Sequence, residues 1–349
     1  MFFIRRGPYV ILDNIYAVLI FLFSGSLLLS LLISPSVGSA VRVGGYFIFT
    51  LSNLIILPSV ISFKHIVFLA SRYSSILIIL GFLPYIGIQS IFGLFDLSLW
   101  GANLYIYPAL SPIRSIFSNP NALGFVVLVG IIAALIESVI TLRRDAVALF
   151  LFNTVGLLFT NYRTGMVVFA ITVSLCVVYT LFGQQMYTVS VVGGLTTFAL
   201  LLLGMFGVIP GPTLLTEISL NGRRVLWRGA AMAVIETPLF GVGFGNYPTI
   251  VDNPHNSYLR MFLALGISGG SVYLLIVLRA ILHSARKATD WAFLGVSLYL
   301  VAFFFVQTMN SLTFIGVSFH SVIISLLIGY HMKSDSLTCR KATEWTAEV

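Results

Sequence analysis

The stretch PNALGFVVLVGIIAALIESVIT, residues 120–141, decides the class of this protein. Its one charged residue is Glu137, which lies close to its C-terminal end. A run of about 20 apolar residues, coiled as a helix, spans the hydrocarbon core of a bilayer. Comparable runs recur along the whole chain, so we expect an integral membrane protein.

The composition agrees with this class. Of the 349 residues, 58% are hydrophobic and only 9% are charged, and the mean hydropathy is +1.03. Soluble domains carry roughly a quarter charged residues, so no separate soluble domain is expected. The net charge of +8 is read loop by loop and predicts no nucleic-acid partner. Cys176 and Cys339 are too far apart in the predicted topology to form a disulfide.

We predict an all-α, polytopic, GT-C-like transmembrane helix bundle of about ten spans. Residues 1–333 form one multi-pass membrane domain, and residues 334–349 form a polar cytoplasmic tail. A cleaved signal peptide is the competing interpretation of the first run, but its length and the spans that follow favour a transmembrane helix. The predicted spans are residues 14–34, 44–63, 74–95, 120–141, 145–160, 164–182, 187–208, 256–282, 290–309 and 314–331.

The basic residues predict the orientation. With both termini in the cytoplasm, most of the basic residues and all of the lysines fall inside, as the positive-inside rule requires. The basic residues predicted outside are all arginines: Arg42, Arg114, Arg163, Arg223, Arg224, Arg228 and Arg260. Arginine binds phosphate through two parallel hydrogen bonds, which favours an anion site on the outer face. The alternative is that these side chains only extend to the membrane interface.

Residues 209–254 form the main outer loop. Within it, residues 223–236 have helical spacing and no proline, which predicts a short amphipathic helix on the outer face. Asn221 could cap this helix, and Pro238 stops it. Arg224 and Arg228 then lie one turn apart on one face, where like charges repel unless an anion binds between them.

Several functions are disfavoured by residues that the sequence lacks. The spans carry few ionisable groups, which argues against an ion-coupled transporter. The five histidines do not cluster, there is no closely spaced acidic pair, and there is no phosphate-binding glycine loop with a lysine. We therefore predict no metal, no cofactor and no use of ATP.

His255 is the one histidine that this topology places outside. A neutral imidazole there can take a proton from an attacking hydroxyl, and Asn256 could orient it or the substrate. The alternative is a histidine in the headgroup zone with no role. Three acidic residues are weaker candidates for the base: Glu217, Glu236 and Asp252.

The segment that begins at His255-Asn256 continues with nine residues, Gly266, two residues and Gly269. This pattern resembles the histidine-glycine motif of the O-antigen ligase family. Upstream, GRRVLWRGAAMAVIETPLFGVGFGNY, residues 222–247, resembles the same family's pattern. NYRTG at 161–165 and RSIFSNPNALG at 114–124 are similar to two of its shorter elements. The resemblance covers about half of the chain.

The resemblance implies a membrane glycosyltransferase that uses a polyprenyl-diphosphate-linked glycan donor on the outer face of the cytoplasmic (inner) membrane, in surface polysaccharide or lipopolysaccharide biosynthesis. It implies catalysis by His255 and diphosphate binding by Arg163 and Arg223, without a metal. Helpers are expected by location: Arg224, Arg228 and Arg114, with Asn256, Trp227 and Glu236 in support. The chain departs from the family in having about ten spans where twelve are common, which leaves the acceptor, a glycan or a lipid-glycan, open.

Two alternatives share these residues or this setting. A polymerase, which extends one lipid-linked glycan with another, would use the same arginines and histidine. A lipid-glycan flippase or exporter would need a polar path through the bilayer, which the apolar spans do not provide.

Overall fold

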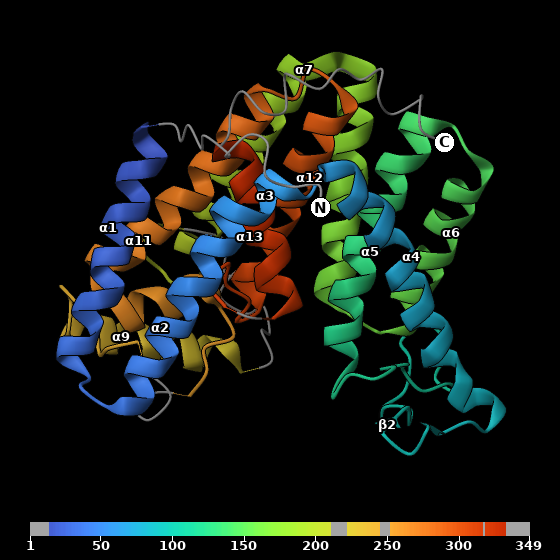
Figure 1. The fold of residues 1–349 in the computed structure, drawn as a ribbon, viewed down its shortest axis with the longest axis horizontal. Helices are drawn as coiled ribbons and strands as arrows, with labels where there is room; N and C mark the ends of the chain where they lie inside the picture. The colour runs from blue at the N-terminus through green and yellow to red at the C-terminus, as the bar shows by residue number, and fades with distance from the viewer. Residues whose placement is uncertain (1–13, 211–221, 245–251, 317, 333–349) are drawn as a thin grey trace, which may run out of the picture.

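The computed structural model describes residues 14–210, 222–244, 252–316 and 318–332. Helices dominate this part of the chain, which confirms the predicted all-α polytopic bundle (Figure 1). The described strands are β1 (Ser90–Ile91) and β2 (Phe95–Asp96), which pair as a small antiparallel hairpin. The predicted tail, the proposed cap Asn221 and the alternative base Glu217 lie outside the described residues.

Short helices complete two of the membrane-length stretches. A π-helical turn, η1 (Ser52–Ile56), joins α2 to α3, and a 3-10 turn, η2 (Leu83–Ile86), ends α4. Seven of the described helical stretches are long and apolar enough to cross a membrane. The α-helices are α1 (Asn14–Ile33), α2 (Val37–Leu51), α3 (Leu57–Val60), α4 (Phe63–Phe82), α5 (Pro120–Thr141), α6 (Arg144–Phe159), α7 (Arg163–Met205), α9 (Arg223–Glu236), α11 (Ser257–Arg286), α12 (Trp291–Met309) and α13 (Phe319–Met332).

Helix α7 is two antiparallel passes rather than one long rod. Its backbone leaves the helical conformation at Gly183, where φ is 76° and ψ is −174°. Tyr162, just before α7, contacts Asn310 at the end of α12, and Tyr179 contacts Trp291 at the beginning of α12. After the turn at Gly183, Phe198 contacts Phe304 in the second half of α12, so the chain runs back along the same helix. The predicted separate spans 164–182 and 187–208 correspond to these two halves.

The second and third predicted spans are displaced along the sequence. Helix α2 begins at Val37, where the Ser36 side chain accepts a hydrogen bond from the Ser39 backbone N–H. The predicted span 74–95 is wrong at both ends, because α4 and η2 cover residues 63–86 and residues 90–96 form the β hairpin. The early start escaped the hydropathy pattern because α4 contains Arg72, whose charge is neutralised by Glu137 of α5.

That ion pair closes the bundle at the end opposite α9. The two Arg72 terminal nitrogens donate to the two Glu137 carboxylate oxygens at 2.7 and 2.8 Å, a bidentate geometry. Ser71 donates a third hydrogen bond to the same carboxylate. A few residues further along, Asn153 of α6 bonds to Ser74 and Ser75 of α4. Helices α4, α5 and α6 are thus held together by polar contacts as well as by apolar packing.

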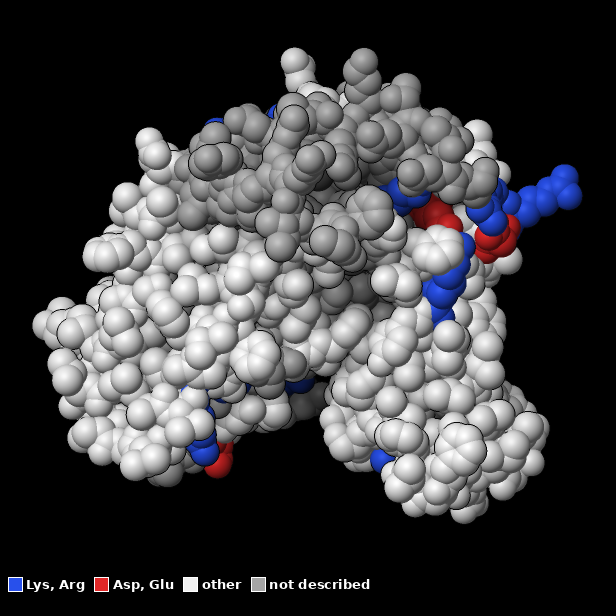
Figure 2. All heavy atoms as spheres, in the orientation of Figure 1, with Lys and Arg blue, Asp and Glu red and all other residues white. Residues whose placement is uncertain are grey.

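The bundle has an inner and an outer layer of helices. In α5 and α12 about four-fifths of the most apolar stretch is buried (78% and 83%), against 22% in α1 and 28% in the stretch Val37–Val60, which begins with α2. Helices α1 and α2 therefore present apolar surface outward, as lipid-facing helices do. In the space-filling view the Lys, Arg, Asp and Glu atoms gather near the two ends of the helices and leave the middle of the visible face without charged residues (Figure 2).

The predicted outer end carries α9, the β hairpin and the loop that leads to α5, and we call it the site face. It is at the bottom of Figure 1. The space-filling view shows this end hollowed between two lobes, with Lys or Arg atoms at the head of the hollow and on both lobes (Figure 2). The turn after α6 and the segment before α11 reach the same end, so residues from distant parts of the sequence meet there.

Candidate functional site

Helix α9 covers residues 223–236, which are the residues that the sequence predicts. Its start follows Gly222, whose φ of 78° is left-handed, and it ends two residues before Pro238. One face is buried through Trp227, Ala230 and Ala233, and the opposite face is exposed. Its buried face packs on α11, where Leu263 is fully enclosed beside Ala233. The predicted amphipathic helix is confirmed.

Trp227 holds the chain segment that carries His255. Its indole Nε1 donates to the backbone carbonyl of Pro254 at 2.7 Å, and the ring is 1% exposed. The other face of the indole lies near Phe206, with ring centroids 6.0 Å apart. Because an indole N–H must be satisfied when buried, this bond fixes the approach of α9 to the residue preceding His255.

His255 itself is exposed and sits in an unusual backbone conformation. Its φ is 48°, and its backbone N–H donates to the Asn253 side-chain oxygen at 3.0 Å. A left-handed non-glycine residue is costly and needs such local support. The next residue, Asn256, caps α11 by accepting hydrogen bonds from the backbone N–H groups of Tyr258 and Leu259. The structure therefore gives Asn256 a helix-capping role, and its predicted part in orienting His255 stays a prediction.

The predicted span 256–282 is broken at Gly266. There φ is 67° and ψ is −169°, so the first turns of α11 and the remaining residues to Arg286 are separate helical segments. A Cβ on Gly266 would lie 2.4 Å from the backbone of Leu239, and one on Gly241 would lie 2.4 Å from the Leu263 carbonyl oxygen. Because neither motif glycine has a Cβ, the segment after α9 crosses the break in α11 in direct backbone contact. In this contact the Val242 N–H donates to the Leu263 carbonyl at 3.0 Å.

His255 and Arg223 are close enough to influence each other electrostatically. Partial burial lowers the pKa of His255, and the positive charge of Arg223 lowers it further. Burial also lowers the pKa of Arg223, whose terminal nitrogen lies 3.5 Å from the Met309 sulfur. A neutral imidazole beside a guanidinium can accept a proton while the guanidinium binds an anion.

The turn after α12 connects the segment around His255 to the turn between α6 and α7. Asn310 Nδ2 donates to the Tyr162 hydroxyl at 2.9 Å, and the Asn310 carbonyl accepts from Ser257 Oγ at 2.7 Å. Ser311 Oγ donates to the same Asn253 oxygen that supports His255. Tyr162 is 3% exposed, and its ring lies against the backbones of Gly124 and Gly165.

Sequence reasoning missed Tyr162, Asn253 and Ser311 as site neighbours. Tyr162 stands inside NYRTG, one residue before Arg163, and Asn253 stands two residues before the motif residue His255, so their position was a usable signal. Ser311 lies far along the chain and gave none. Asn310 stands out in sequence only as a polar residue near a span end.

Arg163 begins α7 at the same turn. Its side chain is exposed, and the guanidinium carbon lies 3.9 Å from the centre of the Tyr105 ring. Tyr105 belongs to the long loop between the β hairpin and α5. The structure therefore places Arg163 between that loop and the Tyr162–Asn310 contact, within the site face.

The remaining predicted residues are less tightly grouped. Arg224 donates to the Met205 backbone carbonyl at 3.1 Å, at the end of α7. Arg228 and Glu236 are exposed on α9, and Asp252 is exposed before Asn253. These positions leave their predicted roles untested.

Arg114 serves the loop in which it lies. Its guanidinium pairs with Asp96 and bonds to the carbonyls of Ser98 and Phe117 at 2.8 and 3.0 Å. The hydrogen bonds that Asp96 accepts from the Ser98 backbone N–H and from the Arg114 guanidinium lower the pKa of its carboxyl. The nearby Asn119 caps α5 by accepting from the Ala122 N–H. Arg114 and Asn119 thus both have local structural roles, and a substrate role for Arg114 stays a prediction.

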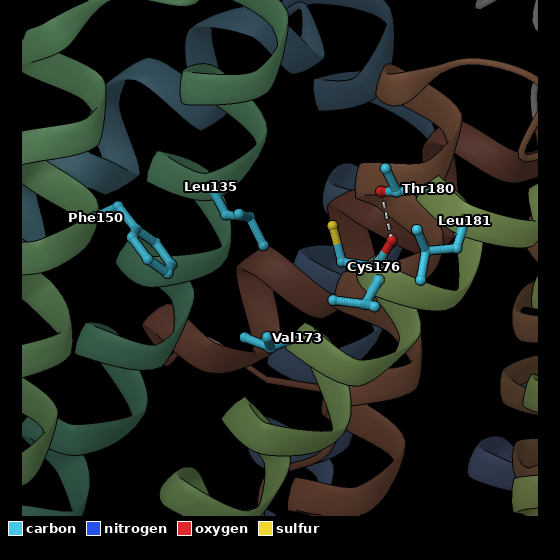
Figure 3. A pocket seen from close by; sticks show the side chains of 7 residues that line it. Leu135, Phe150, Val173, Cys176, Thr180 and Leu181 are labelled. Atoms are coloured by element: carbon cyan, nitrogen blue, oxygen red, sulfur yellow. Dashed lines mark hydrogen bonds between the residues drawn. The ribbon is translucent and has the colours of Figure 1, made fainter.

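An apolar pocket of about 300 Å³ lies elsewhere, between α5, α6 and the first half of α7. Figure 3 shows Leu135 and Phe150 facing Val173 and Cys176 across it. Its polar contact is internal, from Thr180 Oγ1 to the Cys176 carbonyl at 2.8 Å. The pocket lies toward the end of the bundle opposite α9, since nearby Tyr179 contacts Trp291 at the start of α12.

Comparison with known proteins supplies the family. Residues 146–274 match the family model described as O-Antigen ligase. This range includes His255, Arg163 and all of α9, and it leaves Arg114 outside. No curated protein matches the chain. The chain is a multi-pass membrane protein whose residues 146–274 are similar to the O-antigen ligase family.

Proposed function

We propose that this chain is a metal-independent ligase that moves a glycan from a polyprenyl-diphosphate carrier to an acceptor hydroxyl on the outer face of the cytoplasmic membrane. The observation that carries the proposal is the Trp227–Pro254 hydrogen bond, which holds the segment of His255 against α9, the helix that begins at Arg223. The family assignment supports this class of reaction, and the donor, the acceptor and the orientation are our inference.

The reaction is a single displacement at the anomeric carbon of the donor sugar. The acceptor oxygen forms a bond to that carbon while the bond from the carbon to the diphosphate oxygen breaks. The leaving diphosphate takes the bonding electrons, and His255 takes the acceptor proton. With no nucleophilic carboxylate assigned to the site, direct attack with inversion is the simplest route.

Arginine side chains stabilise the leaving group. As the bond breaks, negative charge grows on the diphosphate, so fixed cations lower the barrier more than they strengthen ground-state binding. Arg223 and Arg163 are proposed to hold the diphosphate, with Arg224 and Arg228 assisting. Because Arg223 is partly buried, its attraction for an anion is stronger than that of a fully hydrated arginine.

His255 suits the role of base because it is neutral near neutral pH. Burial and the charge of Arg223 both lower its pKa, so the imidazole can accept a proton. Its backbone is fixed through Asn253 and the Pro254–Trp227 bond, which holds the Cα of His255 in place relative to α9. Glu236 and Asp252 are exposed alternatives that we rank below it.

Two other functions remain distinguishable by their products. A polymerase would lengthen the polyprenyl-linked chain instead of transferring it to a different acceptor. An exporter would move lipid-linked glycan across the membrane and would not require His255.

The test is complementation of a strain that lacks the protein, using His255→Ala, Arg223→Ala and the control Arg42→Ala. Arg42 is an exposed arginine of α2 outside the site. Each variant is checked for membrane abundance. Surface glycan is then examined on gels and the lipid-linked glycan by mass spectrometry.

A ligase loses surface glycan in both site variants and accumulates full-length lipid-linked chains, whereas Arg42→Ala behaves as the unchanged protein. Accumulation of single repeat units identifies a polymerase. Normal surface glycan in His255→Ala refutes the assigned base, and translocation that survives this change favours an exporter.

A further inference from the structure

The loop between the β hairpin and α5 carries three exposed aromatic side chains at the site face, Trp100, Tyr105 and Tyr107, which we call the row. The exposed fractions are 42% for Trp100, 61% for Tyr105 and 58% for Tyr107. Trp and Tyr side chains exposed at the end of a membrane bundle serve either the membrane interface or the binding of a ligand. None of them is used in the mechanism above.

This loop is fixed to the bundle by its backbone. The Asn161 side chain accepts from the Tyr105 N–H at 3.2 Å and donates to the Asn103 carbonyl at 3.1 Å. The Ile113 N–H bonds to the Phe159 carbonyl at 3.0 Å, and Leu104 and Ile113 are buried. The aromatic side chains are therefore displayed by a loop that is anchored within the row, at Asn103 and Tyr105, and again after it, at Ile113.

One member of the row, Tyr105, lies directly at the proposed diphosphate site. Tyr105 lies under the guanidinium of Arg163, and the neighbouring Tyr162 bonds to Asn310, which in turn accepts from Ser257. In a polyprenyl-diphosphate-linked glycan the first sugar is attached directly to the diphosphate. A diphosphate held by Arg163 therefore brings the sugars next to Tyr105.

The chemistry of the row favours sugar over lipid. Trp100, Tyr105 and Tyr107 combine a flat apolar face with a polar N–H or O–H, which suits a ring that has C–H bonds on one face and hydroxyls at its edge. Arg114 of the same loop pairs with the exposed Asp96 of the adjoining strand β2, so the loop lies at a level where charge is hydrated. Among the purely apolar residues here, Ile106 of the same loop is exposed to 54%, and the most exposed ones, Phe92 and Leu94, are at the β-hairpin tip.

We propose that Trp100, Tyr105 and Tyr107 form a stacking platform for the sugar rings of the donor glycan, beside the diphosphate held by Arg163. This inference rests on the proposed function and extends it from the diphosphate to the glycan. The platform sets affinity for the glycan part of the donor and takes no part in the bond-breaking step.

The test measures binding to purified full-length protein in lipid nanodiscs with two probes. One is polyprenyl diphosphate without a glycan, and the other is the polyprenyl-diphosphate-linked glycan extracted from cells that lack this protein. The variants are Trp100→Ala and Tyr107→Ala, whose backbone hydrogen bonds are kept, and the matched controls are Phe92→Ala and Leu94→Ala at the hairpin tip.

We expect Trp100→Ala and Tyr107→Ala each to weaken binding of the glycan-linked probe by about tenfold, the size of one lost stacking contact. Binding of the glycan-free probe and of both probes to the hairpin-tip variants stays unchanged. In transfer assays the same two variants raise KM for the donor and leave kcat within about twofold, because the stacking is equal in the ground and transition states.

Equal weakening of both probes, or no weakening, overturns the platform. So does quenching of Trp100 fluorescence by brominated lipids, measured as the difference from Trp100→Phe, because it places the row in the bilayer. If the glycan-linked probe binds normally to the unchanged protein and His255→Ala abolishes transfer, such a result refutes only the platform. If that probe does not bind the unchanged protein at all, the proposed function and the platform both fail.

Discussion

The indole Nε1 of Trp227 donates a hydrogen bond to the backbone carbonyl of Pro254, 2.7 Å away. This bond joins the amphipathic helix α9, which carries Arg223, to the segment that carries His255. The relative position of the proposed base and the proposed anion-binding residue is therefore set by one buried contact between main chain and side chain.

Replacing Trp227 by phenylalanine keeps the aromatic packing and removes this donor. The buried Pro254 carbonyl then lacks its partner, at a cost of about 1–3 kcal/mol, and the segment around His255 shifts. We expect kcat for glycan transfer to fall by roughly tenfold or more at normal membrane abundance. The control is Trp291→Phe, which contacts Tyr179 at the other end of the bundle. Equal activity in the two variants would contradict this role for Trp227.

The acid limb of the pH–rate profile should report the ionisation of His255. Because burial and Arg223 lower its pKa, the neutral form persists below the ordinary histidine range, and kcat/KM should fall only at lower pH. Removing the positive charge in Arg223→Gln favours the imidazolium, so its pKa rises and the acid limb moves to higher pH. The limb in Arg42→Gln stays in place. NMR titration of the His255 ring gives the same comparison if Arg223→Gln is too slow to assay. An acid limb that does not move in Arg223→Gln would show that Arg223 does not affect the pKa of His255.

Asn310 is expected to position the site without contacting the substrate. Asn310→Ala removes the donor to the Tyr162 hydroxyl, although the Asn310 carbonyl still accepts from Ser257. We expect kcat to fall about tenfold, for one lost buried hydrogen bond, with a smaller change in KM. Tyr162→Phe removes the other partner, and the double variant should lose little more than either single one. Additive losses would show that the two side chains act independently.

Gly266 should tolerate no side chain. Its φ of 67° is unfavourable for alanine, and a Cβ would lie 2.4 Å from the Leu239 backbone. We predict that Gly266→Ala separates α11 from the segment after α9 and strongly reduces the amount of folded protein in the membrane. Gly193→Ala is the matched control, because a Cβ there meets nothing within 4 Å. Detergent thermal-stability measurements should show a large loss only in the first variant.

The Arg72–Glu137 pair is expected to stabilise the bundle without affecting chemistry. Glu137→Gln leaves Arg72 without its bidentate partner, and we expect a loss of about 3 kcal/mol of stability with unchanged KM in the protein that folds. Asp145→Asn, at a more exposed carboxylate near the same arginine, should have no measurable effect. Loss of transfer in Glu137→Gln at full abundance would instead connect this end of the bundle to the site.

The amino-acid sequence by itself determined the class of the protein. Apolar length gives the helices, because backbone polar groups in a bilayer must be paired within a segment. The helical spacing and Pro238 gave α9 its bounds, and Gly183 falls between two predicted spans, where the chain turns back. The resemblance singled out His255 and Arg223, which the family match then placed in one domain.

Only the tertiary structure decided which residues surround His255. The hydropathy pattern did not predict the start of α4, because a charged residue such as Arg72 is typical of a loop. In the structure its charge is neutralised by Glu137, 65 positions away. The break at Gly266 depends on the approach of Leu239, and the support of Asn253 depends on Ser311. Hydropathy and spacing describe contacts within one helix or turn. Contacts between distant segments arise only when the helices pack, and those contacts bring Arg163, Arg223 and His255 to the same face.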